Sequence, residues 1–176
     1  MRMPAKARAS APSQHTGNPI RDSALALVPE TLDEVVALNA AVWKRSLVAP
    51  AILETLRLRN ARTVNCVFCK SVRYEVARAD GLTEARAAMI DTGYEHSALT
   101  EREKLAVALA DSYLGFPAGM SASLAQRLAR EFSFEQVASM FVALMSFNFT
   151  SRTAVSIGGM PEEPQQVVLM PLAEDD

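Results

Sequence analysis

Apolar side chains recur at three- and four-residue intervals along most of the chain, which is the spacing of one face of an α-helix. The first such run follows Thr31 and Glu34, a pair spaced as a capping box, and predicts a helix that starts at Thr31. Pro50 ends this run and suits the first turn of a second helix, predicted to extend to about Thr63. We expect the second helix to expose a series of arginines, Arg57, Arg59 and Arg62.

Helix boundaries are also marked along the rest of the chain. A third helix is predicted to start at or near Cys66 and Cys69 and to run to Asp80, where Gly81 supplies a left-handed C-terminal residue. Thr83 opens a short helix after it. Later helix starts are marked by capping boxes or by single capping residues, namely Thr100 with Glu103, Ser121, and Ser133 with Gln136.

The fold class follows from these patterns. The segment from Phe134 to Ile157 is apolar on nearly all sides, which predicts a central helix or one covered by a neighbouring subunit. No segment alternates apolar and polar residues over a useful length, so we predict an all-α fold. Residues 1–22 indicate a disordered tail, residues 23–160 a helical domain and residues 161–176 a C-terminal extension. The apolar stretch Val167 to Met170 is expected to pack as a strap or to reach a partner chain.

Composition and charge narrow the classes of function. The chain has 176 residues, 49% of them hydrophobic and 22% charged, which fits one domain with a substantial core. A net charge of −2 without a Lys/Arg block argues against binding to nucleic acid or to an anionic membrane. The longest apolar run is too short to span a bilayer, and the first residues lack an apolar signal segment. We therefore expect a cytoplasmic protein whose partner is a small molecule or another protein.

The two cysteines, Cys66 and Cys69, are the most informative feature of the sequence. A disulfide between residues this close restrains little chain entropy, so a purely structural bond explains the pair poorly. A predicted helix start would stabilise a thiolate, and the spacing allows one sulfur to attack and the other to resolve. Two ordinary buried residues are the alternative. We expect no metal, because the histidines His15 and His96 lie far away in sequence and a zinc site needs four ligands.

The context of the cysteine motif resembles a known family. Glu54 stands twelve residues before Cys66, Asn65 and Phe68 flank the cysteines, and a helix is predicted to follow. The likeness continues through 80–83, 100–103 and 147–152. Over about residues 32 to 158, the sequence resembles the carboxymuconolactone decarboxylase and alkylhydroperoxidase (AhpD-like) family. This resemblance implies an AhpD-like helical bundle that forms a homo-oligomer.

The resemblance also implies roles for individual residues. Cys66 and Cys69 would form the reactive dithiol, with Cys69 favoured as the attacking sulfur, and Glu54 would belong to a proton relay completed by a histidine at residue 73. This chain has Arg73 there, and a guanidinium cannot act as a reversible acid or base. We predict that Arg73 either stabilises the thiolate or is held by Glu54. The alternative for Glu54 is a solvated carboxylate paired with Arg57.

Two other polar features are open to interpretation. His96 is a substitute proton donor only if its loop lies over Cys69, and is otherwise a surface residue. Asn148 and Arg152 lie one turn apart on the apolar helix, where they are expected to hold the core or a subunit interface together.

Three hypotheses of function follow. The first is a peroxidase-type oxidoreductase that reduces a peroxide or a disulfide through Cys66 and Cys69, needs a thiol reductant and carries no cofactor. The second is a non-catalytic helical oligomer that lost turnover with its histidine. The third is a lyase of the decarboxylase branch acting on a lactone acid, which would need a basic pocket. Candidates for that pocket are Arg62, Arg73 and Arg152.

Overall fold

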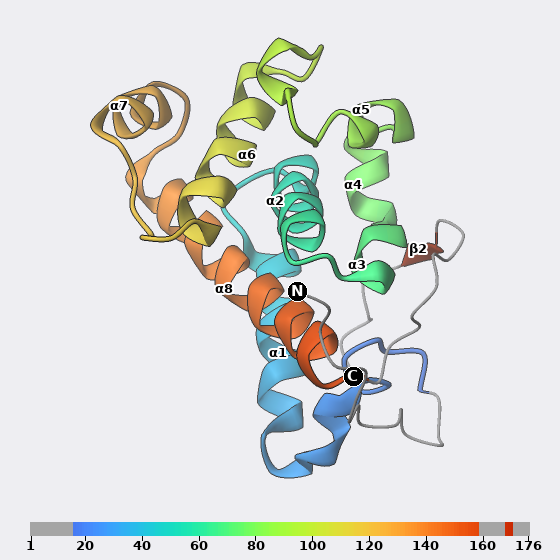
Figure 1. Ribbon diagram of the computed structural model, residues 1–176. Coiled ribbons are helices and arrows are strands. Elements are labelled where there is room, and N and C mark those ends of the chain that lie inside the picture. Colours follow the sequence, from blue (N-terminus) through green and yellow to red (C-terminus); the bar gives the residue numbers. More distant parts are fainter. Residues whose placement is uncertain (1–15, 159–167, 171–176) are drawn as a thin grey trace, which may run out of the picture.

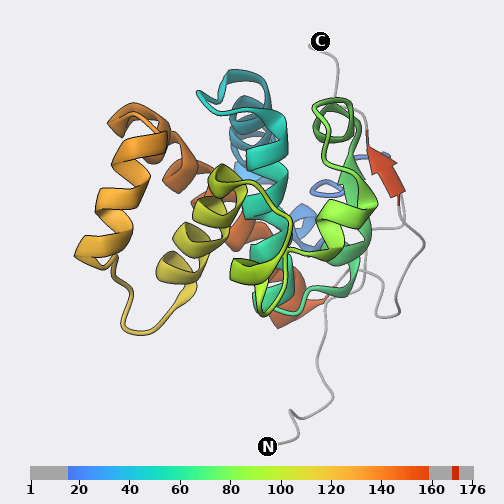
Figure 2. The same cartoon turned by 90° about the horizontal axis from the view of Figure 1, so that it is seen from above.

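A computed structural model describes residues 16–158 and 168–170, and these residues form a helical bundle around one central helix (Figure 1). The central helix is α2, Pro50–Thr63, which contacts α3, α4, α6 and α8. The longer elements around it are α1 (Pro29–Arg45), α6 (Glu101–Leu114), α7 (Ala122–Glu131) and α8 (Phe134–Ile157). The shorter elements are η1 (Ala24–Leu27), α3 (Val67–Ser71), β1 (Val72–Tyr74), α4 (Glu75–Ala79), α5 (Glu84–Ala88), η2 (Tyr94–His96) and β2 (Val168–Met170). Figure 2 shows α7 and the α4, α5 and β2 segments on opposite sides of α2.

Helix α2 is central because it faces two hydrophobic clusters at once. Leu53 and Leu56 pack into the larger cluster with residues of α1, α6 and α8, whereas Leu58 packs into a second cluster with residues of α5 and α6. The expectation of an exposed arginine series on α2 is therefore wrong. Arg57 is 6% exposed, and Arg59 and Arg62 are partly buried. The spacing of arginines in a sequence does not show whether their side chains lie in water or are buried and paired with groups of neighbouring elements.

The local capping signals confirm most predicted helix starts. Both reciprocal hydrogen bonds of the capping boxes at Thr100 and Ser133 are present, and the side chains of Thr83 and Ser121 cap α5 and α7. The start predicted at Thr31 is wrong. Helix α1 begins two residues earlier, at Pro29, whose fixed φ suits the first helical position. The predicted ends at Thr63 and Ile157 are confirmed.

The third predicted helix is interrupted. Instead of one helix to Asp80, the chain forms α3, the short strand β1 and then α4. Strand β1 pairs in parallel with β2, so that Val72 lies opposite Val168 and Tyr74 opposite Met170. A pairing partner about a hundred residues away leaves no local signal, which explains why the break was not predicted. Two three-residue strands leave the predicted all-α fold class unchanged, and residues 168–170 form a strap along β1.

The described structure begins at Thr16, inside the segment predicted to be a disordered tail. The Asp22 carboxylate accepts hydrogen bonds from the backbone N–H groups of Thr16 and Gly17, at 2.7 and 2.9 Å. Ile20 is only 6% exposed. Residues 16–22 are thus held by short-range side-chain contacts that carry no helical period. The remainder of that tail and most of the predicted extension 161–176 lie outside the described residues, as does His15.

None of the helices in the described ranges combines the length and apolarity needed to cross a membrane.

We expect the α2 packing to dominate the free energy of unfolding. Leu53 is fully buried in the larger cluster, so Leu53→Ala should cost about 2–5 kcal/mol through lost burial and a residual cavity. Leu47 is 56% exposed, and Leu47→Ala should change stability by less than about 0.5 kcal/mol. Urea denaturation of both variants measures the difference, and equal losses would contradict this description of the core.

Candidate dithiol site

The turn after α2 places Cys66 and Cys69. Asn65 adopts a left-handed backbone with φ of 57°, which asparagine tolerates better than most residues. The N–H of Cys66 donates to Ala61 O and the N–H of Asn65 donates to Arg62 O, the two bonds of a Schellman motif that ends α2. The chain then enters α3 with Cys66 as its N-cap, whose Sγ accepts the Cys69 N–H at 3.2 Å.

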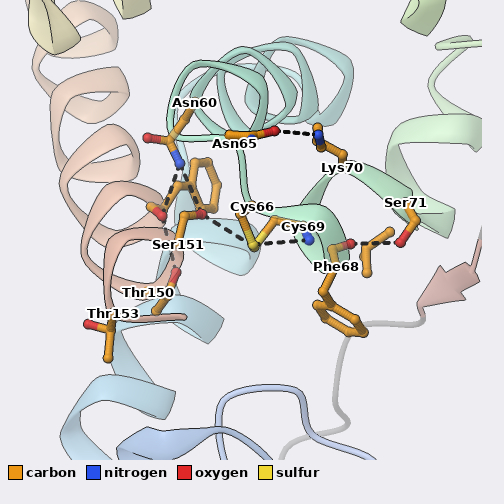
Figure 3. The surroundings of a disulfide bond; sticks show 12 residues. Asn60, Asn65, Cys66, Phe68, Cys69, Lys70, Ser71, Thr150, Ser151 and Thr153 are labelled. Atoms are coloured by element: carbon orange, nitrogen blue, oxygen red, sulfur yellow. Dashed lines mark hydrogen bonds between the residues drawn. A yellow bond between two sulfur atoms is a disulfide. The ribbon is translucent and has the colours of Figure 1, made fainter. Parts of the chain in front are cut away.

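The two sulfurs form a disulfide but have different surroundings (Figure 3). Cys66 is 2% exposed and belongs to the buried core. Cys69 is half-buried and lines a pocket, and its Sγ lies 3.5 Å from the hydroxyl oxygen of Ser151 on α8. An incoming small molecule therefore meets Cys69 first.

Glu54 and Arg57 form a buried clamp beneath the cysteines. Arg57 Nε and Nη2 each donate to one Glu54 carboxylate oxygen at 2.7 Å, and Glu54 is 1% exposed. The same guanidinium donates to Cys69 O at 2.7 Å and to Val72 O at 2.5 Å, so it binds α3 at its middle residue and at its C-cap. Burial opposes the charge of Arg57, but the facing Glu54 carboxylate outweighs it and raises the pKa of Arg57.

Of the two interpretations of Glu54, the pairing with Arg57 is confirmed, whereas the expected solvation of that pair is wrong. Both carboxylate oxygens bind Arg57, so Glu54 influences the cysteines through that side chain. Sequence reasoning missed Arg57 as a residue of the site. The pocket lining and the contacts to α3 appear only when the segments are brought together.

Arg73 does not pair with Glu54, so the second of the two alternatives predicted for it is wrong. Its Nε lies 3.0 Å from a Glu84 oxygen, and its Nη1 donates to the carbonyls of Lys70 and Val72 at 2.7 and 2.8 Å. The prediction assumed a helix, in which residues 69 and 73 share a face. In strand β1 successive side chains alternate, so Val72 and Tyr74 reach the pocket while Arg73 does not line it.

The pocket at Cys69 is small, with a volume of about 60 Å³. Its walls come from the segment before α1, from α1 to α3, from β1 and from α8. Burial raises the pKa of Tyr74, whose ring stacks on Trp43 at 4.1 Å between centroids, so this phenol stays neutral near pH 7. The residues that line the pocket around Cys69 are mostly apolar. Phe68, Phe147 and Ser151 lie in segments that carry the family resemblance, whereas the sequence did not point to Ile20, Leu25 and Tyr74.

Other predicted participants lie elsewhere. His96 is exposed in η2 and does not line the pocket. Asn148 donates to the buried Asn60 at 2.8 Å, and Arg152 donates to Asn148 at 2.9 Å, so this pair contacts the core as expected. Within residues 16–158 and 168–170, no group of three His, Cys, Asp or Glu side chains is arranged to hold a metal ion.

Comparison with known proteins defines the fold. A crystal structure of a protein of unknown function from Agrobacterium tumefaciens, described as a candidate antioxidant defence protein AhpD, matches with a TM-score of 0.67. It is 23% identical, and the match covers 80% of this chain and 95% of that one. The protein thus has the AhpD-like fold that the sequence resemblance implied.

Sequence relatives are less informative about activity. Two uncharacterized proteins of Mycobacterium tuberculosis, from strains CDC 1551 and H37Rv, are each 30% identical over 146 residues. The match covers 78% of this chain and 51% of each relative, so the chain spans about half the length of the curated relatives it matches. No family model matches the chain.

We expect the buried clamp to be essential for stability. Glu54→Gln removes the charge that faces Arg57 and should destabilise the fold by about 3 kcal/mol or more, because an unmatched guanidinium stays buried. Asp111→Asn disrupts a more exposed ion pair, with Arg59, and should cost about 1 kcal/mol or less. Urea denaturation at neutral pH compares them. Similar small losses would show that Glu54 and Arg57 are not a tightly coupled pair.

Proposed function

We propose that the protein is a thiol-dependent oxidoreductase that reduces a small peroxide at Cys66 and Cys69 and is regenerated by a separate thiol reductant. The observation that carries this proposal is the disulfide-linked pair with one sulfur in a small pocket and the other in the core. The AhpD-like fold supports it. Because the cycle needs a supply of reducing thiols, a cytoplasmic location suits it.

The size of the pocket favours a small peroxide over a protein disulfide. A volume of about 60 Å³ holds a few water-sized groups, since about 10–15 Å³ admits one water molecule. Hydrogen peroxide or a short alkyl hydroperoxide fits this space. The apolar walls suit an alkyl group.

The reaction uses both sulfurs in turn. In the reduced protein the Cys69 thiolate attacks the terminal peroxide oxygen, the O–O bond breaks, and the alkoxide leaves as an alcohol after taking a proton. Cys69 is now a sulfenic acid. Cys66 attacks the Cys69 sulfur, forms the disulfide and releases water. Two electrons from an external dithiol restore both thiols, and the external dithiol becomes a disulfide.

We assign Glu54 a positioning role in this cycle. It holds Arg57, and Arg57 binds the backbone carbonyl of Cys69 itself and that of Val72, three residues later. Arg73 remains a candidate for stabilising the thiolate through its charge, although it pairs with Glu84 and not with a sulfur.

The lyase hypothesis has less support. Its candidate residues Arg62, Arg73 and Arg152 do not line the pocket at Cys69, and the first two donate to main-chain carbonyls. The pocket is lined by the guanidinium of Arg57, but this group already forms an ion pair with Glu54 and is not available to pair with the carboxylate of a lactone acid.

Peroxide consumption tests the proposed activity. With dithiothreitol as reductant, wild-type protein should consume hydrogen peroxide or tert-butyl hydroperoxide, and Cys69→Ser should reduce the rate to background because the attacking sulfur is gone. Without dithiothreitol, which would itself reduce a sulfenic acid, Cys66→Ser should complete a single turnover that stops at the sulfenic acid. Equal background rates for wild type and Cys69→Ser would remove the peroxidase hypothesis and favour a non-catalytic helical protein.

We also propose that the protein forms a homo-oligomer through the outer face of α8 and α1. Large apolar side chains along this face stay 37–48% exposed, at Leu38, Val142, Met145 and Phe149. The three α8 residues follow one another at three- and four-residue spacing, which makes a continuous stripe. An apolar stripe of this kind is typical of a covered surface.

The oligomer proposal is tested by light scattering after size-exclusion chromatography. Met145→Glu places a charge in the middle of the stripe and should lower the mass to that of a 19.1 kDa monomer. Met120→Glu changes a residue of similar exposure outside the stripe and should leave the mass of the assembly unaltered. A monomeric wild-type protein would contradict the proposal.

A further inference from the structure

A line of hydrogen bonds connects the surface of α8 to the Cys69 sulfur. Arg152 Nε donates to Asn148 Oδ1 at 2.9 Å, and Asn148 Nδ2 donates to Asn60 Oδ1 at 2.8 Å. Asn60 Nδ2 donates to Ser151 Oγ at 3.1 Å, and the Ser151 hydroxyl donates to Cys69 Sγ at 3.5 Å (Figure 3). The line joins α8, α2 and α3, and we call it the α8 donor chain.

Every bond in the α8 donor chain points toward the sulfur. The orientation of Asn60 is fixed, because its Nδ2 also donates to Phe147 O at 3.1 Å, and a flipped amide would set two carbonyls against each other. Since Asn60 donates to Ser151 Oγ, the Ser151 hydrogen is available for Cys69. Hydrogen bonds aligned in one direction polarise one another, and a guanidinium stands at the outer end.

The inner half of the α8 donor chain is shielded from water. Asn60 is fully buried and Ser151 is 3% exposed, so their dipoles act on the sulfur through a medium of low dielectric constant. In the disulfide the sulfur is a weak acceptor. When Cys69 is reduced and ionised, the same hydroxyl becomes a charge-assisted donor.

We infer that the α8 donor chain stabilises the Cys69 thiolate. Ser151 touches the reacting sulfur, while Asn60, Asn148 and Arg152 are positioning residues. The catalytic meaning of this inference rests on the proposed function, but the stabilisation of the thiolate does not.

Other charged and titratable groups around Cys69 are few in the described part of the pocket. Arg57 comes from α2 and binds the Cys69 carbonyl, Tyr74 comes from β1, and Cys66 lies on the same turn. The pocket residues of α1, of α8 and of the segment before α1 carry no charge. Arg57 and Tyr74 are unchanged in the variants below, so their effect on Cys69 is common to all of them.

The test measures the pKa of Cys69 in the full chain with Cys66→Ser as background, so that one thiol titrates. The probe is the pH dependence of the rate of alkylation by iodoacetamide. Ser151→Ala should raise the pKa by about one unit, which leaves about tenfold less thiolate below both pKa values. Ser151→Thr keeps a hydroxyl and should restore the pKa.

A matched pair of surface variants tests whether the guanidinium at the outer end of the α8 donor chain affects the pKa of Cys69. Arg152→Gln removes the positive charge at the outer end of the α8 donor chain. It should leave about twofold less thiolate, because the effect of this charge is passed through four hydrogen bonds. Arg130→Gln removes an exposed guanidinium from α7 and should have no effect. Both substitutions lie on the surface, so the comparison holds even where Ser151→Ala fails to fold.

The outcomes separate this inference from the proposed function. An unchanged pKa in folded Ser151→Ala, or equal shifts in Arg152→Gln and Arg130→Gln, would overturn the role of the α8 donor chain. A raised Cys69 pKa in Ser151→Ala, together with no peroxide turnover in the wild type, would support the role of the α8 donor chain and reject the proposed peroxidase activity. Peroxide turnover in the wild type with an unchanged Cys69 pKa in Ser151→Ala would reject the role of the α8 donor chain and leave the proposed peroxidase activity standing.

Discussion

The buried ion pair of Glu54 and Arg57 determines where the cysteines lie. A guanidinium this deeply buried must be matched in charge and hydrogen-bonded through its donors, and Glu54 with the Cys69 and Val72 carbonyls meets that demand. These contacts join the central helix α2 to α3 and to the beginning of β1. The position of the thiol turn is therefore set by an electrostatic requirement of the core, and the short helix α3 need not be stable alone.

The asymmetry of the two sulfurs follows from this placement. Cys66 continues directly from the end of α2 and is covered by the core, while Cys69 lies one turn later, at the boundary between α3, α8 and the pocket. A redox pair with one sulfur accessible and the other protected suits a cycle in which the accessible sulfur reacts first. Ser151 adds a second difference, because it contacts Cys69.

Arg73 shows how a local change of structure alters a functional prediction. As part of a helix it would have faced the cysteines, one turn beyond Cys69. As the middle residue of β1 it turns the other way and pairs with Glu84, and Arg57 takes the place beside Glu54. The absent histidine is thus not replaced at the same position. The side chains that bind Cys69 come from α2, where Arg57 donates to its carbonyl, and from α8, where Ser151 donates to its sulfur.

Most helix boundaries and the candidate chemistry of this protein can be predicted from its sequence. Capping boxes at Thr100 and Ser133, and Pro50 at a first turn, act within one helical turn, so their effect can be read locally. The Cys66 and Cys69 pair is equally local. Three features depend on tertiary contacts: β1 pairs with β2 where the third helix was predicted, the Glu54 and Arg57 pair is buried and binds Cys69, and Ser151 reaches the Cys69 sulfur. Such contacts join residues far apart in the chain, and no short-range pattern specifies which segments burial will bring together.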